Sequence, residues 1–280
     1  MAHSVDSSSI DSSPLGHKTA YISTYDVSLL FPIPRAESRH AIGLAGDLPF
    51  YGQDIWTGYE LSWLNSKGKP EVAVAEFSIP FNSTNIIESK SFKLYLNSLN
   101  QTKFSGLNEV KELLVKDLSA IAGVVVNVSL HPLCNSNLLI DFTFDGVCID
   151  GLDITVDAYH PQETLLISNE SDQVTEALYS HLLKSNCPVT GQPDWASIFI
   201  EYSGAKIDHE NLLRYVISFR EHQDFHEHCV ERIFTDILQE CKPKSLSVYA
   251  RYTRRGGLDI NPFRSTEKNA VPKVGRLLRQ

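Results

Sequence analysis

The chain has 280 residues, and 25 lysines and arginines against 34 aspartates and glutamates give a formal net charge of −9 at pH 7. This acidic balance argues against a nonspecific nucleic-acid binder, which needs a basic face to meet phosphates. No apolar run is long enough to cross a membrane, and residues 1–18, rich in Ser and Asp, are expected to form a flexible leader without a secretion signal. Five cysteines without paired spacing favour a reducing cytoplasm over a disulfide framework.

The first half of the chain predicts strands, then two helices, then strands again. Two strands over 56–64 and 72–79 are separated by a turn at 65–70, where Asn, Ser, Gly and Pro gather. We expect a helix that begins after Asn85 as its N-cap, and a second helix over 108–120, because each segment has an apolar stripe at helical spacing. Further strands are expected at 123–130 and 138–144.

The second half predicts a similar order. A helix is expected over 174–184, a strand over 197–202, helices over 210–220 and 226–239, and a last strand over 245–252. An offset of 120 residues superposes Tyr95 on Tyr215 and Ser98 on Ser218, which indicates an internal duplication. The pattern therefore predicts an α+β fold, in which antiparallel sheets carry helices on one face.

Cys187 is the strongest candidate for chemistry. It follows the helix predicted over 174–184, precedes a proline, and lies seven positions before Asp194. Gly191 and Pro193 lie between them, so the segment must fold back, and the thiol and the acid could face one small pocket. A thiolate that attacks an electrophilic carbon, with an acid to protonate the atom that gains charge, would be covalent catalysis. The alternative is a small cysteine in the core.

Three other segments offer functional groups. Ile87, Glu88, Ser89 and Lys90 lie at a predicted helix start, where an acid simply suits the helix dipole, or where free amides and Lys90 attract a phosphate. The segment 225–229 offers His226 as a proton donor and Glu227 as a carboxylate. The segment 251–257 is a basic, glycine-containing loop that could contact phosphates or be a solvated tail.

Metal and nucleotide motifs are absent from the sequence. His222 and His226 have the i, i+4 spacing of a metal pair, but Val230 stands where a zinc protease needs a further histidine. No glycine-rich Rossmann or Walker motif follows a strand. We therefore expect no bound metal, and any dinucleotide must bind outside a Rossmann crevice.

Taken together, the segments 87–95, 185–195, 225–227 and 251–261 closely resemble the NADPH-dependent 7-cyano-7-deazaguanine reductases, the nitrile reductases of queuosine biosynthesis in tRNA modification. The likeness extends from 25–30 and 32–35 nearly to the end of the chain, and it is to the long form of the family. The resemblance implies two tunnelling-fold modules, here 19–150 and 151–280, each with a strand–helix–helix–strand order. It also implies a cytoplasmic homodimer that binds neither nucleic acid nor membrane directly.

The resemblance also implies a role for each site residue. Cys187 attacks the nitrile carbon to give a thioimide, Asp194 donates a proton to nitrogen, and two NADPH molecules in turn complete the reduction to the primary amine. His226 lines the pocket and assists proton movement. The implied substrate contacts are Ile87, Glu88, Ser89, His226 and Glu227, and the implied NADPH contacts are Ser89, Lys90, Arg255 and Gly256.

Two other functions remain compatible with the local chemistry. A cysteine-dependent hydrolase would use Cys187 and His226, but would leave the 88–90 and 254–256 segments without a task. A non-catalytic purine-binding module would have Cys187 only as a wall of its pocket. NADPH oxidation on adding substrate tests the first alternative, and covalent labelling of Cys187 by the nitrile tests the second.

Overall fold

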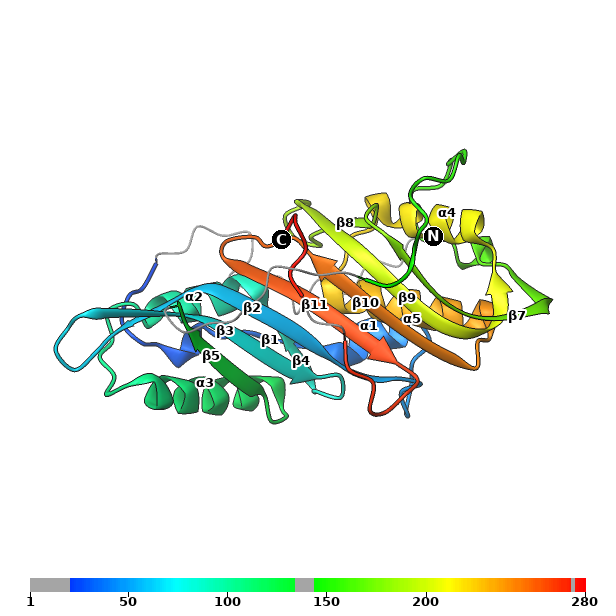
Figure 1. Ribbon diagram of the computed structural model, residues 1–280. Helices are drawn as coiled ribbons and strands as arrows, with labels where there is room; N and C mark the ends of the chain where they lie inside the picture. Colours follow the sequence, from blue (N-terminus) through cyan, green and yellow to red (C-terminus); the bar gives the residue numbers. More distant parts are fainter. Residues whose placement is uncertain (1–20, 134–143, 273–274) are drawn as a thin grey trace. The chain divides into compact units, whose positions relative to one another are not determined.

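The structure is a computed structural model that describes residues 21–133, 144–272 and 275–280. It divides into two compact units, each containing segments from distant parts of the sequence (Figure 1). The described part of unit 1 is 21–43, 54–133 and 254–259, and that of unit 2 is 44–53, 144–253, 260–272 and 275–280.

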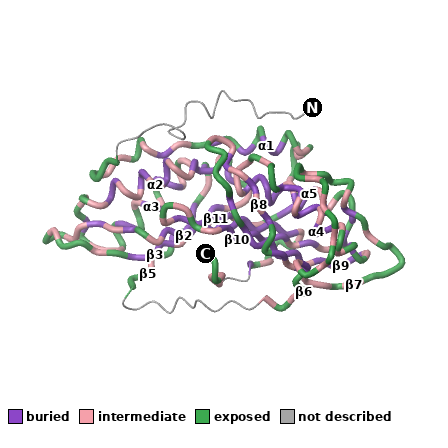
Figure 2. Tube along the Cα trace, turned by 90° about the horizontal axis from the view of Figure 1, so that it is seen from above, coloured by how far each residue is buried: buried purple, intermediate pink, exposed green. Residues whose placement is uncertain are grey.

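Unit 1 is built on a sheet with the strand order β5-β3-β2. Strand β2 (Tyr51–Leu64, with 54–64 in this unit) and β3 (Pro70–Pro80) flank the predicted turn, and β5 (Asn127–Pro132) pairs antiparallel with β3. Helices α2 (Ser89–Ser98) and α3 (Leu107–Ala122) lie on the same face of this sheet (Figures 1 and 2). The ring of Phe92 on α2 lies edge-on to Trp56 and Phe77 at centroid distances of 5.3 and 4.9 Å, so aromatic packing joins helix to sheet.

The start of the described chain packs against α2. After the short helix η1 (Val27–Leu29), β1 (Pro32–Pro34) pairs antiparallel with β4 (Asn85–Ile87), and α1 (Arg35–Ala41) follows. The backbone N–H of Glu88 donates to the carbonyl of Phe31 at 2.9 Å, and the N–H of Phe31 donates to Ser91 Oγ at 3.0 Å. These bonds fix the first turn of α2, where several candidate residues lie.

Unit 2 has the larger sheet, with the strand order β11-β10-β9-β7-β6 and with β8 paired to β9. The strands are β6 (Val147–Cys148), β7 (Ser168–Ser180), β8 (Lys184–Asn186), β9 (Pro193–Ile207), β10 (Ser245–Tyr252) and β11 (Leu258–Ser265, with 260–265 in this unit). The helices are η3 (Glu163–Leu165), α4 (His209–Ser218), η4 (Phe219–Glu221) and α5 (His226–Cys241). Neighbouring strands are antiparallel except for β6 and β7, and α4 and α5 cover one face (Figure 2).

The two units repeat a specific contact between their paired helices. In unit 1 the hydroxyl of Tyr95 on α2 donates to Asp117 Oδ2 on α3 at 2.8 Å. In unit 2 the hydroxyl of Tyr215 on α4 donates to Asp236 Oδ2 on α5 at 2.6 Å. Tyr95 and Tyr215 are the pair superposed by the 120-residue offset, and all four groups lie on equivalent helices. The α+β class, the antiparallel sheets and the repeated strand–helix–helix–strand order expected of tunnelling-fold modules are therefore confirmed.

Three of the expected local elements are wrong or lie outside the described residues. The helix expected over 174–184 is strand β7 up to Ser180, because its residues pair with β9 in a long antiparallel register whose bonds override an apolar spacing that fits either structure. Asn85 is not a helix cap: it lies in β4, its side-chain amide donates to Ile121 O at 2.9 Å, and Glu88 caps α2 instead. The strand expected at 138–144 falls almost wholly on residues outside the described part.

Within the described residues, no helix is long and apolar enough to cross a membrane. Four cysteines lie in these residues, and all are free thiols: Cys148, Cys187, Cys229 and Cys241. Cys148 is exposed and the other three are buried.

Candidate active site

A tight turn in unit 2 carries Cys187. Strand β8 pairs antiparallel with the start of β9, with Ser185 opposite Asp194. The N–H of Cys187 donates to Gln192 O at 2.9 Å, and the N–H of Gly191 donates to Cys187 O at 3.0 Å. Gly191 has φ 65°, a left-handed conformation that glycine adopts without a steric penalty. The predicted fold-back is confirmed, but Cys187 follows a strand and not a helix.

The same turn is attached to the start of α5. The N–H of Asn186 donates to His222 O at 2.8 Å, and the N–H of Asp224 donates back to Asn186 O at 3.1 Å. The ammonium of Lys184 adds a bond to Arg220 O at 2.8 Å. Backbone pairing thus holds the residue before Cys187 against the segment that leads into His226.

His226 and Asp194 meet at this point. His226 is the first residue of α5, and its Nε2 lies 3.3 Å from Asp194 Oδ2. Both side chains are largely removed from water, at 12% and 4% exposure, and Cys187 is 6% exposed. Within the described residues, the buried Nδ1 of His226 has no hydrogen-bond partner, so it can bond to a ligand. The structure therefore gathers a thiol, a carboxyl group and an imidazole around one hairpin and one helix start.

The ring of Tyr252 holds the imidazole of His226 in place. The two rings stack at a centroid distance of 3.8 Å and an interplanar angle of 3°. The N–H of Tyr252 donates to Asn261 Oδ1 at 3.1 Å, and Gln280 Nε2 donates to Tyr252 O at 2.9 Å. Burial, followed by the nearby charges of Cys229 and Asp194, raises the pKa of the Tyr252 hydroxyl well above its usual value, so this ring stays neutral.

A second carboxylate fixes the approach to α5. Asp224 Oδ1 lies 3.0 Å from His228 Nδ1, and its Oδ2 lies 3.7 Å from His222 Nε2. Burial disfavours the charged form of Asp224, but the two histidines outweigh it and lower the pKa of this carboxyl. Burial likewise opposes the charge on His228, but Asp224 outweighs it and raises the pKa of His228. His222 precedes α5, so its i, i+4 spacing from His226 does not place the two side chains on one helix face. The two histidines contact different carboxylates, Asp224 and Asp194.

In unit 1, Ile87 ends β4 and Glu88 caps α2. Glu88 is fully buried, and its carboxylate accepts from the N–H groups of Lys90 and Ser91, both at 2.7 Å. Burial raises the pKa of Glu88, and these two bonds oppose the rise. The interpretation that free amides here attract a phosphate is wrong for these two amides, because Glu88 already occupies them. The positive charges of Lys93 and Lys90 also oppose the rise in the pKa of Glu88.

The basic loop of unit 1 turns tightly against α2. Arg255 and Leu258 exchange backbone bonds, with Arg255 N–H donating to Leu258 O at 2.9 Å and Leu258 N–H donating to Arg255 O at 3.3 Å. Gly256 has φ 58°, and a Cβ there would lie 3.3 Å from Cδ of Lys93. Lys90 and Lys93 are three residues apart and therefore share a helix face. The loop and this face together present several cations.

Comparison with known proteins identifies the family to which this chain belongs. A family model described as "Nitrile reductase, 7-cyano-7-deazaguanine-reductase N-term" matches residues 21–130, and one described as "QueF-like protein" matches 193–271. A protein of Burkholderia multivorans named NADPH-dependent 7-cyano-7-deazaguanine reductase is 56% identical over 269 residues, which cover 96% of this chain and 98% of that protein. The chain belongs to the 7-cyano-7-deazaguanine reductase family.

A second relative agrees with this family. A protein of Dechloromonas aromatica with the same name is 57% identical over 269 residues, which cover 96% of this chain and 95% of that protein. Among solved structures, an archaeosine synthase described as QueF-Like, in the apo form, is 20% identical and covers 36% of this chain and 96% of its own, with a TM-score of 0.30. The last likeness is too low to carry an argument.

The residues that the reductase family resemblance assigned fall into two groups. Unit 2 contains Cys187, Asp194, His226 and Glu227, the last 2% exposed in the first turn of α5. Unit 1 contains the remaining six: Ile87, Glu88, Ser89, Lys90, Arg255 and Gly256. Sequence reasoning gave no role to Tyr252 or Lys93. Tyr252 could have been found as an aromatic residue at a strand end just before a basic loop. Lys93 could have been found from its i, i+3 spacing from Lys90, which places both on one helix face.

Proposed function

We propose that this protein reduces the nitrile of 7-cyano-7-deazaguanine to the primary amine 7-aminomethyl-7-deazaguanine with two NADPH per turnover, in queuosine biosynthesis. The observation that carries the proposal is the contact of Asp194 with His226 beside the buried turn of Cys187. The names of the relatives support the choice of substrate and cofactor, because they are 56–57% identical over 96% of this chain.

The proposed nucleophile is the thiolate of Cys187. Its sulfur forms a bond to the nitrile carbon, and one electron pair of the triple bond moves to nitrogen, which takes a proton from Asp194. The product is a thioimide, in which a poor hydride acceptor has become a better one. After the first hydride arrives, the C–S bond breaks, the electron pair returns to sulfur and an imine is released. Over the whole reaction, nitrile, two NADPH and two protons give amine and two NADP⁺.

His226 is proposed to return protons to Asp194. Its Nε2 lies within 3.3 Å of Asp194 Oδ2, close enough for transfer after a small tightening when substrate binds. Two protons enter each turnover, so the acid must be reprotonated before the second reduction. The buried Nδ1 of His226 lacks a partner in the described chain, and the substrate is proposed to supply it. Because Tyr252 stacks on the ring, the imidazole is presented to Asp194 in one orientation.

The carboxylates are proposed to recognise the heterocycle. Glu227 in unit 2 would accept hydrogen bonds from the guanine-like edge, and a buried acceptor of this kind rejects rings that lack the donors. In unit 1, Ile87, Glu88 and Ser89 are proposed as substrate contacts. Glu88 is already oriented by two backbone bonds, so little side-chain entropy is lost when it binds.

NADPH is proposed to bind to the cationic face of unit 1. The residues fit an anionic dinucleotide, since Lys90, Lys93 and Arg255 carry positive charge and the Lys93 side chain lies against the exposed turn at Gly256. Ser89 adds a hydroxyl at the start of α2. When bound, NADPH supplies the hydride that carbon receives in each of the two reductions. The protein's part is to hold the phosphates and to keep the reacting carbon away from water.

A stoichiometric assay tests the proposed function. NADPH oxidation is followed by absorbance while amine and residual nitrile are counted by mass spectrometry, with Cys187→Ser as the matched variant. We expect two NADPH oxidised per amine formed, and no turnover in Cys187→Ser. Consumption of nitrile without NADPH oxidation, giving amide or acid, would show a hydrolase instead.

We also propose that the protein works as a homodimer in the cytoplasm. The free state of the four described cysteines, one of them exposed, supports a reducing compartment. The dimer is expected from the family resemblance. Sedimentation equilibrium tests it: a mass of about twice the 31.4 kDa chain is expected, and a monomer that turns over at full rate would contradict it.

A further inference from the structure

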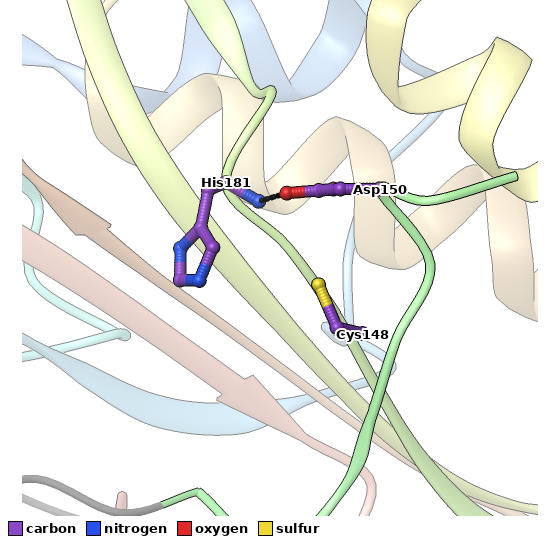
Figure 3. A group of neighbouring side chains, drawn as sticks. All are labelled: Cys148, Asp150 and His181. Carbon is purple, nitrogen blue, oxygen red and sulfur yellow. Dashed lines mark hydrogen bonds between the residues drawn. The ribbon is translucent and has the colours of Figure 1, made fainter.

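Unit 2 contains a cluster of three side chains that could bind a metal ion, and none of the three is a residue proposed for catalysis. Cys148, Asp150 and His181 each offer one ligand atom, and these three atoms lie within 4.8 Å of one another (Figure 3). Cys148 and His181 are exposed and Asp150 is half-buried. Neither the reaction proposed above nor the family resemblance uses any of them.

Two chain segments are paired in a way that brings these groups together. Strand β6 pairs parallel with the end of β7, with Cys148 beside Tyr179, and the N–H of Ile149 donates to Tyr179 O at 3.0 Å. The carboxylate of Asp150 then accepts from Ser180 Oγ at 2.6 Å and from the N–H of His181 at 2.9 Å. Each carboxylate oxygen has a second lone pair, so the group can still coordinate an ion.

A third segment orients the imidazole. His181 Nδ1 lies 2.7 Å from Ser197 Oγ on β9, and Ser197 is buried. If Nδ1 donates to the hydroxyl, Nε2 keeps a free lone pair, which is the tautomer that a metal ligand needs. An outer partner of this kind is typical of histidine ligands in metal sites. The ring of Tyr179 packs edge-on against the same imidazole at 5.3 Å, which restricts it further.

From this geometry we infer that Cys148, Asp150 and His181 form a binding site for a divalent transition-metal ion, Zn²⁺ above all. A thiolate, an imidazole and a carboxylate match the preferences of zinc, and the hard ions Mg²⁺ and Ca²⁺ would prefer oxygen ligands alone. Three protein ligands leave a fourth tetrahedral position, and because Cys148 and His181 are exposed, water would occupy it.

The ion would act as a clip at the sheet edge. β6 is the last strand of the unit 2 sheet and has only two residues, so few backbone bonds hold it. Cys148 and Asp150 come from the β6 side and His181 from the end of β7, so one ion would join both segments. Binding to the folded form alone would raise the free energy of unfolding.

Cobalt substitution tests the site without reference to turnover. The full chain, stripped of metal, is titrated with Co²⁺ while the thiolate-to-cobalt charge-transfer absorption is recorded. We expect one Co²⁺ per chain and displacement by Zn²⁺. The absorption should vanish in Cys148→Ser, whose exposed position leaves the fold intact, and should persist in Cys187→Ser. Ser197→Ala should weaken affinity by about 10- to 100-fold, the usual effect of losing an outer partner.

The variants distinguish this site from the proposed active site. Cys187 and His226 could themselves take a metal, so absorption that persists in Cys148→Ser but is lost in Cys187→Ser would overturn the inference. Absence of the absorption in the unaltered chain would also overturn it. Neither result depends on the nitrile reaction, so failure of the metal site and failure of the proposed function are separate outcomes.

Discussion

Substitution of Tyr252 tests how the imidazole of His226 is positioned. The two rings stack at 3.8 Å with an interplanar angle of 3°, and Tyr252 is fully buried. An aromatic pair is worth about 0.5–1.5 kcal/mol beyond its burial. If that energy holds the imidazole toward Asp194, its loss in Tyr252→Leu lowers the population of the productive orientation by roughly 2- to 13-fold. We expect kcat to fall by this factor, with a smaller change in KM for the nitrile.

The assay must separate orientation from loss of folded protein. Tyr252→Leu also destabilises the fold, by roughly 1–3 kcal/mol, as many core substitutions do. Active sites are therefore counted first, by intact mass after mixing with the nitrile in the absence of NADPH, and kcat is expressed per competent site. Tyr252→Phe is the matched control, because it keeps the ring and removes only the hydroxyl.

We expect Tyr252→Phe to retain nearly the full kcat. Equal losses in Tyr252→Phe and Tyr252→Leu would refute the stacking argument, because the hydroxyl alone would then account for the effect. An unchanged kcat per competent site in Tyr252→Leu would also refute the stacking argument, because the ring would then have no effect on the reaction.

Three further predictions concern Asp194, Arg255 and His228. Asp194→Asn keeps the shape of the acid but removes its acidic proton, so kcat should fall by about 100-fold or more while KM for the nitrile changes little. Steady-state kinetics measures both constants, and a raised KM with an unchanged kcat would contradict the role of Asp194 as the acid. Arg255→Ala should raise KM for NADPH by about tenfold, the lower end for a charge-assisted bond at a half-exposed side chain, and an unchanged value would place the phosphates elsewhere. Asp224 raises the pKa of His228, so the stability from protonated His228 is complete below about pH 6.5 and is lost as pH rises through the raised pKa. Chemical denaturation at several pH values should show that slope in the unaltered protein and a flatter one in His228→Gln; parallel curves would contradict the assignment.

Much of the architecture could be predicted from sequence because most elements have a clear period. Four helices have apolar stripes at helical spacing, and the turn at 65–70 is rich in residues that favour turns. The helix expected over 174–184 failed because residues such as Val174, Ala177 and Leu178 fit a helical stripe as well as a strand. Only the partner strand β9 decides between the two, and that partner cannot be read from local spacing.

The candidate site was predictable in its residue types and less so in its contacts. The fold-back at Cys187 followed from Gly191 and Pro193 alone. The sequence could not predict that Glu88 occupies the amides at the start of α2. A glutamate at a helix start can bind either a ligand or the backbone of its own helix. The stack of Tyr252 on His226 joins a strand end to a helix start, and no sequence period reports such a contact.

The proposed reaction depends on a covalent adduct between Cys187 and the nitrile. The most direct measurement is the intact mass of the protein after mixing with 7-cyano-7-deazaguanine in the absence of NADPH. We predict a mass increase equal to one whole substrate molecule per chain, mapped to Cys187, absent in Cys187→Ser and discharged as amine when NADPH is added. No mass increase, or an adduct that persists in Cys187→Ser, would contradict it.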